Sequence, residues 1–360
     1  MNKRNIGVII CICVILGLLA IILAMSPKSP QDPPEPDVVG SSDDVLIRAH
    51  NNWTLFNTSS VIYSYAGDSS DDFGANCGEV WSILAEYHQL FDIYYEYSGI
   101  NNLCTLNKNA GGEALEVSPK LIEFLLYAKE CYTLTNGETN VMMGAVLVLW
   151  HDAREAKNYV PDEQTLLEAS KHTSIDCLEI DAVNNTVRIT DKDARIDVGA
   201  LGKGYATEMA ARYLENKGIS SYVLSIGGNI RLVGTKTNGD GWDNVRIKNP
   251  KNTSTFVKTL CLSDTSCVTS GDYERYYNFN GTKYHHIIDK DTLVPANYFS
   301  SVTIITKDSG LADALSTALF CMSYEEGLAL VESIGGVEVL WIYTDGTIKT
   351  TDGFDALEVK

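Results

Sequence analysis

The stretch Asp197-Val-Gly-Ala-Leu-Gly-Lys-Gly-Tyr-Ala206 places three glycines, one acid and one base just before a helical pattern. Residues 185–195 alternate apolar and polar side chains, which predicts a strand leading into the stretch. Apolar residues then recur every four positions until Gly218, which predicts a helix that ends there. The N–H groups and positive dipole at a helix start favour an anion, and glycines allow a ligand to approach the backbone. The stretch therefore predicts a phosphate site.

Two common phosphate motifs do not fit this stretch. A P-loop has four residues between its first glycine and its Gly-Lys pair, whereas two residues separate Gly199 from Gly202. The dinucleotide pattern G-x-G-x-x-G is also absent. A tight turn that carries a surface lysine remains an alternative for the stretch taken alone.

Length and composition are those of a globular protein with one large domain or two average ones. The chain has 360 residues, of which 45% are apolar and 21% charged, and its formal net charge is -19. This charge argues against a nucleic-acid partner, which would require a basic face. A polyphosphate ligand would need local lysine or arginine side chains and a divalent cation.

The N-terminus predicts a membrane segment. After Lys3 and Arg4, residues 7–25 are uncharged and almost wholly apolar, which is enough for a helix to cross a bilayer. We therefore expect 1–25 to be an anchor or a signal segment, 26–44 a disordered linker and 45–360 the functional domain. The flanking positive charge predicts an inside N-terminus and an extracytoplasmic domain at the cell membrane. A cleaved signal peptide is the alternative.

Helical and strand patterns are mixed along the chain without strict alternation, so we expect an α+β fold with mainly antiparallel sheets. Asn280-Gly281 predicts a hairpin turn, and Ser309 is expected to cap a helix that runs to Met322. Seven cysteines lie outside the N-terminal segment, and no C-x-x-C pair occurs. Neither a zinc site nor a complete disulfide framework is indicated.

Two further segments carry residue types that could bind a metal or take part in catalysis. Asp313 and Thr317, four residues apart, share the polar side of the predicted helix and could hold Mg2+ through hard oxygen atoms. A solvated polar face is the alternative interpretation. The hairpin region 269–289 contains acids, an arginine and the pair His285 and His286, of which at most one can face a given site. A structural role for that histidine is the alternative.

Five ordered motifs of the chain resemble those of the FAD:protein FMN transferases, the ApbE family. The motifs are Asp197–Ala206, Ser225-Ile-Gly-Gly-Asn229, Thr269-Ser-Gly-Asp-Tyr-Glu-Arg275, Tyr284-His-His-Ile-Ile-Asp289 and Leu311-Ala-Asp-Ala-Leu-Ser-Thr-Ala318. The chain departs from the family pattern in three places. The chain has Phe56-Asn-Thr58 where the family has Met-Gly-Thr. Its residues 135–140 stand where the family has Thr-Asp-Gly-Ala-Phe-Asp, and its residues 289–295 stand where the family has Asp-Pro-x-Thr-Gly-x-Pro.

The resemblance implies an ApbE-like, T-fold-like domain with helices packed on its sheets. It also implies FAD as substrate and Mg2+ as cofactor. The implied metal ligands are Asp313, Thr317 and the carbonyl oxygen of Ala200. The implied contacts of FAD are Phe56, Tyr94, Glu138, Thr139, Asn140, Asp197, Lys203 and Ile287. We expect His286 or Asp289 to be the general base.

The implied reaction is Mg2+-dependent transfer of FMN from FAD to a Ser or Thr hydroxyl of another protein, with release of AMP. The chain lacks the family's acceptor sequence Asp-x-x-[Ser/Thr]-Gly-Ala-[Ser/Thr], so the acceptor is expected to be a separate exported or membrane redox protein that carries this flavinylation motif. Two alternatives are an FAD pyrophosphatase, in which water is the acceptor, and a non-catalytic FAD-binding surface protein.

Overall fold

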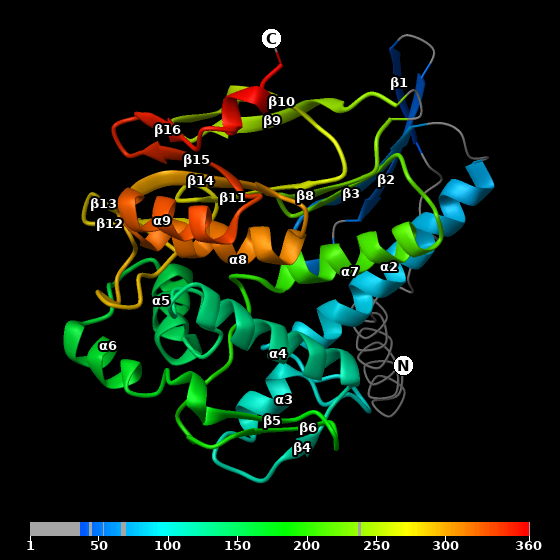
Figure 1. Cartoon of the computed structure of the whole chain (residues 1–360). Helices are drawn as coiled ribbons and strands as arrows, with labels where there is room; N and C mark the ends of the chain where they lie inside the picture. The colour runs from blue at the N-terminus through cyan, green and yellow to red at the C-terminus, as the bar shows by residue number, and fades with distance from the viewer. Residues whose placement is uncertain (1–36, 43–44, 53, 66–69, 237–238, 360) are drawn as a thin grey trace, which may run out of the picture. The chain divides into compact units, whose positions relative to one another are not determined.

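A mixed helix and sheet architecture surrounds one large antiparallel sheet in this computed structural model (Figure 1). The structure describes residues 37–42, 45–52, 54–65, 70–236 and 239–359. Among these residues, nine strands form the main sheet, and each neighbouring pair is antiparallel. Their spatial order is β1 (Asp37–Ser42), β2 (Val45–Asn52), β3 (Ser60–Tyr65), β7 (Tyr222–Ile226), β8 (Asn229–Val233), β11 (Ser266–Gly271), β14 (Phe299–Thr306), β15 (Glu338–Tyr343) and β16 (Ile348–Thr350).

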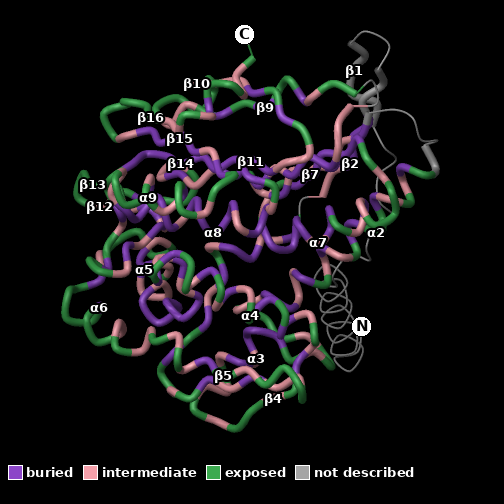
Figure 2. Tube along the Cα trace, in the orientation of Figure 1, coloured by how far each residue is buried: buried purple, intermediate pink, exposed green. Residues whose placement is uncertain are grey.

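The two faces of the main sheet are covered by different elements. Helices α2 (Ser70–Phe91), α7 (Gly202–Asn216) and α8 (Ser309–Cys321) pack on one face, and the hairpin of β9 (Trp242–Asn249) and β10 (Asn252–Leu262) covers the other. Every residue of β14 is buried, because apolar side chains on both faces of that strand are covered. Figure 2 shows the same result, since the buried trace follows the central strands together with α7 and α8.

A second group of elements lies beyond α7 and α8 (Figure 1). It contains α3 (Leu103–Lys108), α4 (Pro119–Leu134), α5 (Gly144–Ala156), α6 (Glu163–Ser170) and the small sheet of β4 (Leu115–Glu116), β6 (Thr186–Ile189) and β5 (Leu178–Asp181). The remaining elements are η1 (Leu55–Asn57), η2 (Ile175–Cys177), the hairpin of β12 (Tyr276–Phe279) and β13 (Thr282–His285), α9 (Tyr324–Ile334) and η3 (Phe354–Leu357).

Local sequence signals account for several boundaries. Asn280 and Gly281 both have positive φ, 49° and 81°, which matches the predicted hairpin turn. Ser118 caps α4, and Pro119 occupies the first turn, where its missing N–H leaves no helical hydrogen bond unmade. The predicted cap of α8 was one residue out, because Asp308 accepts the hydrogen bond from Leu311 N and Ser309 is the first helical residue. The carboxylate of Asp308 therefore takes the capping role.

The expected linker 26–44 is wrong for its described part. Residues 37–42 form β1, which pairs antiparallel with β2 at the edge of the main sheet. An edge strand needs pairing on one side only, so a polar segment without a core of its own can still be held by backbone hydrogen bonds. The predicted membrane segment 1–25 lies outside the described residues. Within the described part of the chain, no helix is long and apolar enough to cross a membrane.

Candidate active site

The glycine-containing stretch lies where the sequence predicts it, immediately before α7. Asp197 donates its backbone N–H to Val141 O at 2.8 Å, and its Oδ1 accepts the N–H of Gly199 at 2.8 Å. The helix starts at Gly202, and the residue before it, Leu201, supplies no side-chain cap. The N–H of Gly202 donates to Val198 O at 2.8 Å, so the feature of this helix start that favours an anion is the positive end of the helix dipole.

Helix α8 brings its polar side directly against this stretch. The Oδ2 atom of Asp313 accepts the backbone N–H of Gly204 at 2.8 Å and lies 3.6 Å from the ammonium nitrogen of Lys203. Asp313 is only 4% exposed, so the solvated polar face considered above is excluded for this residue. A buried carboxylate needs such donors and an opposite charge, because its desolvation is costly. The two segments predicted to act together are in contact.

Gly204 permits this close approach of the two helices. A Cβ atom at this position would lie 2.3 Å from Ser309 O and 2.4 Å from Asp313 Cβ. We expect Gly204→Ala to lower the free energy of unfolding by about 1–3 kcal/mol and to reduce activity, because α8 must move away from the loop. Chemical denaturation and an activity assay check this.

A matched control is available in α2. A Cβ atom at Gly78 would meet no atom within 4 Å. Gly78→Ala should therefore raise stability by about 0.5–1 kcal/mol, as is usual for an exposed helical glycine. Equal effects of the two substitutions would contradict the steric argument.

A buried ionic network holds the start of α8 in place. The Oε2 atom of Glu208, on α7, accepts the backbone N–H of Ser309 at 3.0 Å and the Nε–H of Arg231 at 3.2 Å. Arg231 is fully buried on β8 and also pairs with Glu215 at 2.6 Å. These contacts join α7, α8 and the sheet, and so they fix the position of Asp313 relative to Gly204.

The two neighbouring histidines have different environments. The Nε2 atom of His285 lies 2.7 Å from Ala296 O, and its ring packs edge-on against Phe320, so His285 has a structural position. The Nδ1 atom of His286 is buried and has no hydrogen-bond partner among the described residues. Burial, followed by the positive charges of Arg275 and other neighbours, lowers the pKa of His286 to about 3. His286 is therefore neutral at pH 7, and it becomes an effective proton acceptor when a bound anion offsets these positive charges and raises its pKa.

Asp289 is engaged in holding a loop. Its Oδ1 atom accepts the backbone N–H groups of Asp291 and Thr292 at 2.8 and 2.9 Å. Leu293, which stands where the family pattern has glycine, keeps a left-handed backbone with φ of 61°. A left-handed backbone costs conformational energy in a residue with a side chain. Burial of the Leu293 side chain and the hydrogen bond that Trp150 Nε1 donates to the Leu293 carbonyl at 2.8 Å offset this energy. The loop thus forms without the glycine.

Positive charge gathers around Asp197. Burial raises the pKa of Asp197, while the Gly199 N–H and the charges of His151, Arg275 and Arg154 act in the opposite direction. The exposed ring of Tyr94 lies 5.5 Å from the ring of His151. In an acidic chain, this local positive charge fits an anionic ligand beside an aromatic ring. Sequence reasoning missed His151 and Arg154, because their helix α5 carries no signal that directs it to this site.

The segment 135–140 is attached to the same helix as Asp313. Thr139 is fully buried, and its hydroxyl donates to Ala314 O at 2.8 Å. Asn140 donates its Nδ2–H to Thr173 O at 2.9 Å. Glu138 forms an ion pair with Lys290, at 3.1 Å, and both side chains are largely buried. A pocket of about 400 Å³ opens beside them and includes Asn140 and Lys290 in its wall.

The ion pair joins two segments that both carry predicted contacts of FAD. We expect Glu138→Gln to raise the KM for FAD several-fold with a smaller change in kcat, because positioning is weakened while the reacting groups stay. Lys290→Met should also raise the KM for FAD. The free-energy change from KM in the double variant should be smaller than the sum of the changes in the two single variants. Steady-state kinetics of the three variants checks the coupling, and strictly additive effects would contradict it.

Of the remaining predicted contacts of FAD, Phe56 lies at another point of the fold and Ile287 lies beside His286. Phe56 has a positive φ of 54°, donates its N–H to His88 Nδ1 at 3.3 Å and packs its ring against His88. Asn57 has φ of 52° at the position where the family has glycine, and asparagine tolerates this conformation well. Ile287 is buried next to His286. No described hydrogen bond or ring contact joins Phe56 to Asp197, His286 or Asp313.

Comparison with known proteins agrees with the motifs. Residues 58–341 match the model of the ApbE family. The chain is 32% identical over 279 residues to an FAD:protein FMN transferase of Vibrio cholerae, covering 77% of this chain and 80% of that protein. It is 31% identical over 291 residues to one of Treponema pallidum, covering 76% and 79%.

Solved structures show the same fold. The ApbE protein of Thermotoga maritima superposes with a TM-score of 0.78 at 26% identity, covering 87% of this chain and all of that one. The flavin transferase ApbE of Vibrio cholerae gives 0.73 at 27% identity, covering 87% and 99%. The resemblance inferred from the five motifs is confirmed, and the chain is a member of the ApbE family of flavin transferases.

Proposed function

We propose that this chain transfers FMN from FAD to a Ser or Thr hydroxyl of a target protein, in a Mg2+-dependent reaction that releases AMP. The contact between Gly204 N and Asp313 Oδ2 carries the proposal, because it joins the anion-favouring stretch to a buried carboxylate. Membership of the ApbE family and relatives that are FAD:protein FMN transferases support the same reaction.

The donor set on α8 fits Mg2+. Asp313 has a second carboxylate oxygen that makes no hydrogen bond to described residues, and the hydroxyl of Thr317 follows one turn later, also without a partner there. Carboxylate, hydroxyl and carbonyl oxygens are the hard ligands that Mg2+ takes. We assign the ion to Asp313, Thr317 and the carbonyl of Ala200. When bound, it neutralises diphosphate charge and helps to align the phosphorus for attack.

FAD would bind along the surface from the start of α7 to the segment 138–140. Lys203 and the backbone beside Asp197 would face the diphosphate, since the Lys203 ammonium, the positive charges around Asp197 and the positive end of the α7 dipole lie there. Tyr94, 54% exposed, offers an aromatic face for a ring of the flavin. Phe56, Ile287 and residues 138–140 complete the proposed contacts.

His286 is the stronger of the two candidates for the general base. Its buried Nδ1 has no described partner, whereas Asp289 already accepts two backbone hydrogen bonds that shape its loop. The acceptor oxygen would form a bond to the FMN-side phosphorus while the bond from that phosphorus to the AMP oxygen breaks. The hydroxyl proton would pass to the imidazole, and AMP would leave with the bridging oxygen.

The acceptor would be a separate exported or membrane redox protein with a flavinylation motif, because this chain contains no such sequence. Residues 1–25 would hold the enzyme at the cell membrane with its N-terminus inside and its catalytic domain extracytoplasmic. Fractionation of cells, followed by protease accessibility of the domain in intact cells, tests this placement.

The full chain incubated with FAD, Mg2+ and an acceptor peptide tests the reaction itself. We expect the peptide to gain the mass of FMN on a Ser or Thr, with one AMP released for each peptide modified. Rapid AMP release without peptide, and no modification with it, would make the protein an FAD pyrophosphatase. Stable FAD binding with no turnover would make it a non-catalytic binding protein.

A further inference from the structure

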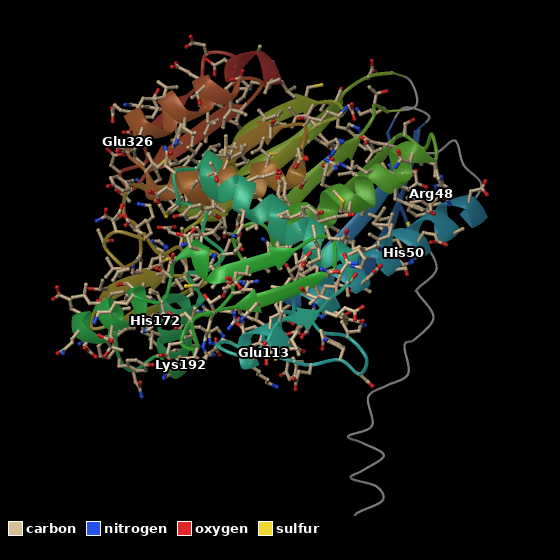
Figure 3. The ribbon with its side chains drawn as sticks, turned by 60° about the horizontal axis from the view of Figure 1, so that its bottom comes forward. Arg48, His50, Glu113, His172, Lys192 and Glu326 are labelled. Atoms are coloured by element: carbon tan, nitrogen blue, oxygen red, sulfur yellow. The ribbon has the colours of Figure 1, made fainter. Side chains whose placement is uncertain are left out.

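We propose that His172, Asp191 and Asp193 form a second metal site, for a borderline divalent ion such as Zn2+, apart from the oxygen ligands on α8. His172 follows α6, and the two aspartates lie in the turn after β6. One potential ligand atom from each residue lies within 4.8 Å of the other two. Figure 3 shows His172 and Lys192, the residue between the aspartates, on the same side of the molecule.

The chemistry of the three side chains favours this class of ion. His172 Nδ1 and Asp191 Oδ2 are 2.7 Å apart and share a proton, and each side chain is only 25% exposed. An ion would replace the shared proton. An imidazole nitrogen with two carboxylates suits Zn2+ or Co2+ better than Mg2+, which prefers oxygen ligands alone.

An open surface depression next to the cluster gives the ion access and an open position. About 360 Å³ of space is bordered by His172, Asp193, Glu168 and Arg195, with apolar side chains of α5 behind them. Sites with three protein ligands leave a fourth position for water, which requires such space. The depression shares no lining residue with the pocket beside Glu138 and Lys290.

The ion would connect two segments that lead to the flavin site. Thr173, directly after His172, accepts the hydrogen bond from Asn140. Arg195, two residues after Asp193, accepts the N–H of Gly144 at 3.1 Å and is followed shortly by Asp197. Linking these segments would restrict the motion of the backbone around Asn140 and Asp197. The melting temperature of the protein should therefore increase when the ion binds.

Calorimetric titration of the full chain with Zn2+, in millimolar Mg2+ that occupies oxygen-only sites, tests the proposal. We expect one equivalent to bind and the melting temperature to rise. Co2+ should give an absorption spectrum without a thiolate charge-transfer band, which separates this site from the cysteines. His172→Gln should weaken Zn2+ binding by more than about 100-fold. Removing a residue that only supports a ligand usually weakens metal binding by about 10-fold to 100-fold, so the larger loss identifies His172 as a ligand.

Asp193→Asn gives a second variant that keeps the turn, because the exposed Asp193 side chain makes one ion pair with the described residues, to Lys192 at 3.5 Å. It should weaken Zn2+ binding at least tenfold. Glu179→Gln is the matched control, since it removes one exposed acid of β5 and should leave binding unchanged. Less than one equivalent bound by the wild type, or unchanged affinity in the His172 and Asp193 variants, would overturn the proposal. Zinc binding is measured directly, so the result does not depend on flavin transfer.

Discussion

Replacing Asp313 with Asn should reduce FMN transfer by about a thousandfold or more. The substitution removes the charge that would hold Mg2+, and metal stabilisation of a phosphoryl group contributes several kcal/mol. An amide oxygen can still accept the Gly204 N–H, so the contact between the stretch and α8 persists. The measurement is the rate of FMN attachment to an acceptor peptide over a range of Mg2+ concentrations.

Two further variants show whether the loss comes from the metal. Thr317→Val keeps the shape of the side chain and should raise the Mg2+ concentration needed for half-maximal rate. Glu332→Gln removes an equal charge from an exposed position on α9 and should leave the rate unchanged. Full activity of Asp313→Asn, or activity that survives chelation of Mg2+, would refute the assigned metal site.

Replacing His286 with Gln should lower kcat by about 100-fold to 10,000-fold, the usual contribution of a general base. Glutamine fills a similar volume but cannot take the proton of the acceptor hydroxyl. Asp289→Asn provides the comparison, because an amide oxygen can still accept the hydrogen bonds from residues 291 and 292. If both variants fold and the Asp289 variant loses more kcat than the His286 variant, Asp289 rather than His286 is the general base.

The pH dependence of His286 follows from its charged neighbours. Burial and the charges of Arg275, Arg154 and Lys203 lower its pKa to about 3, so protonation of His286 in the free enzyme should not limit kcat/KM between pH 5 and 8. Bound diphosphate would offset those positive charges and raise the pKa of His286. The acid limb of kcat should therefore lie at higher pH than that of kcat/KM. An NMR titration of the imidazole with and without FAD provides a direct check.

The same shift affects stability in a defined direction. The folded pKa of His286 is below its unfolded value of 6.5, so between these values the unfolded chain binds more protons. The contribution of the neutral imidazole is therefore fully present above pH 6.5 and is lost as the pH falls towards 3. His286→Gln should show a shallower loss of unfolding free energy across this range in denaturant titrations.

Several local features of this chain were predictable from sequence because they depend on neighbouring residues. The start of α7 after glycine, the turn at Asn280 and Gly281 and the first turn of α4 follow from backbone preferences. The cap of α8 was misplaced because Asp308 and Ser309 are both good capping residues. Helix α3 was not predicted, since its six residues are too few to show a period.

The surroundings of the site could not be predicted without the tertiary structure. Periodicity placed Asp313 on the polar side of its helix but could not say whether water or another helix covers it. Likewise, nothing in the sequence connects Glu138 to Lys290, although both differ from the family pattern, and the two form an ion pair at 3.1 Å. Contacts between distant residues depend on packing, and packing is not encoded in a local pattern.

The sequence by itself determined the family, the segments that carry reactive side chains and the chemical type of each segment, because five ordered motifs and local backbone preferences suffice for that. Only the tertiary structure decided that Gly204 and Asp313, 109 residues apart, share a hydrogen bond and that His286 is left without a described partner. The physical reason is steric. Two helices approach this closely because one carries only a hydrogen atom at the crossing, and their burial against the sheet holds the contact.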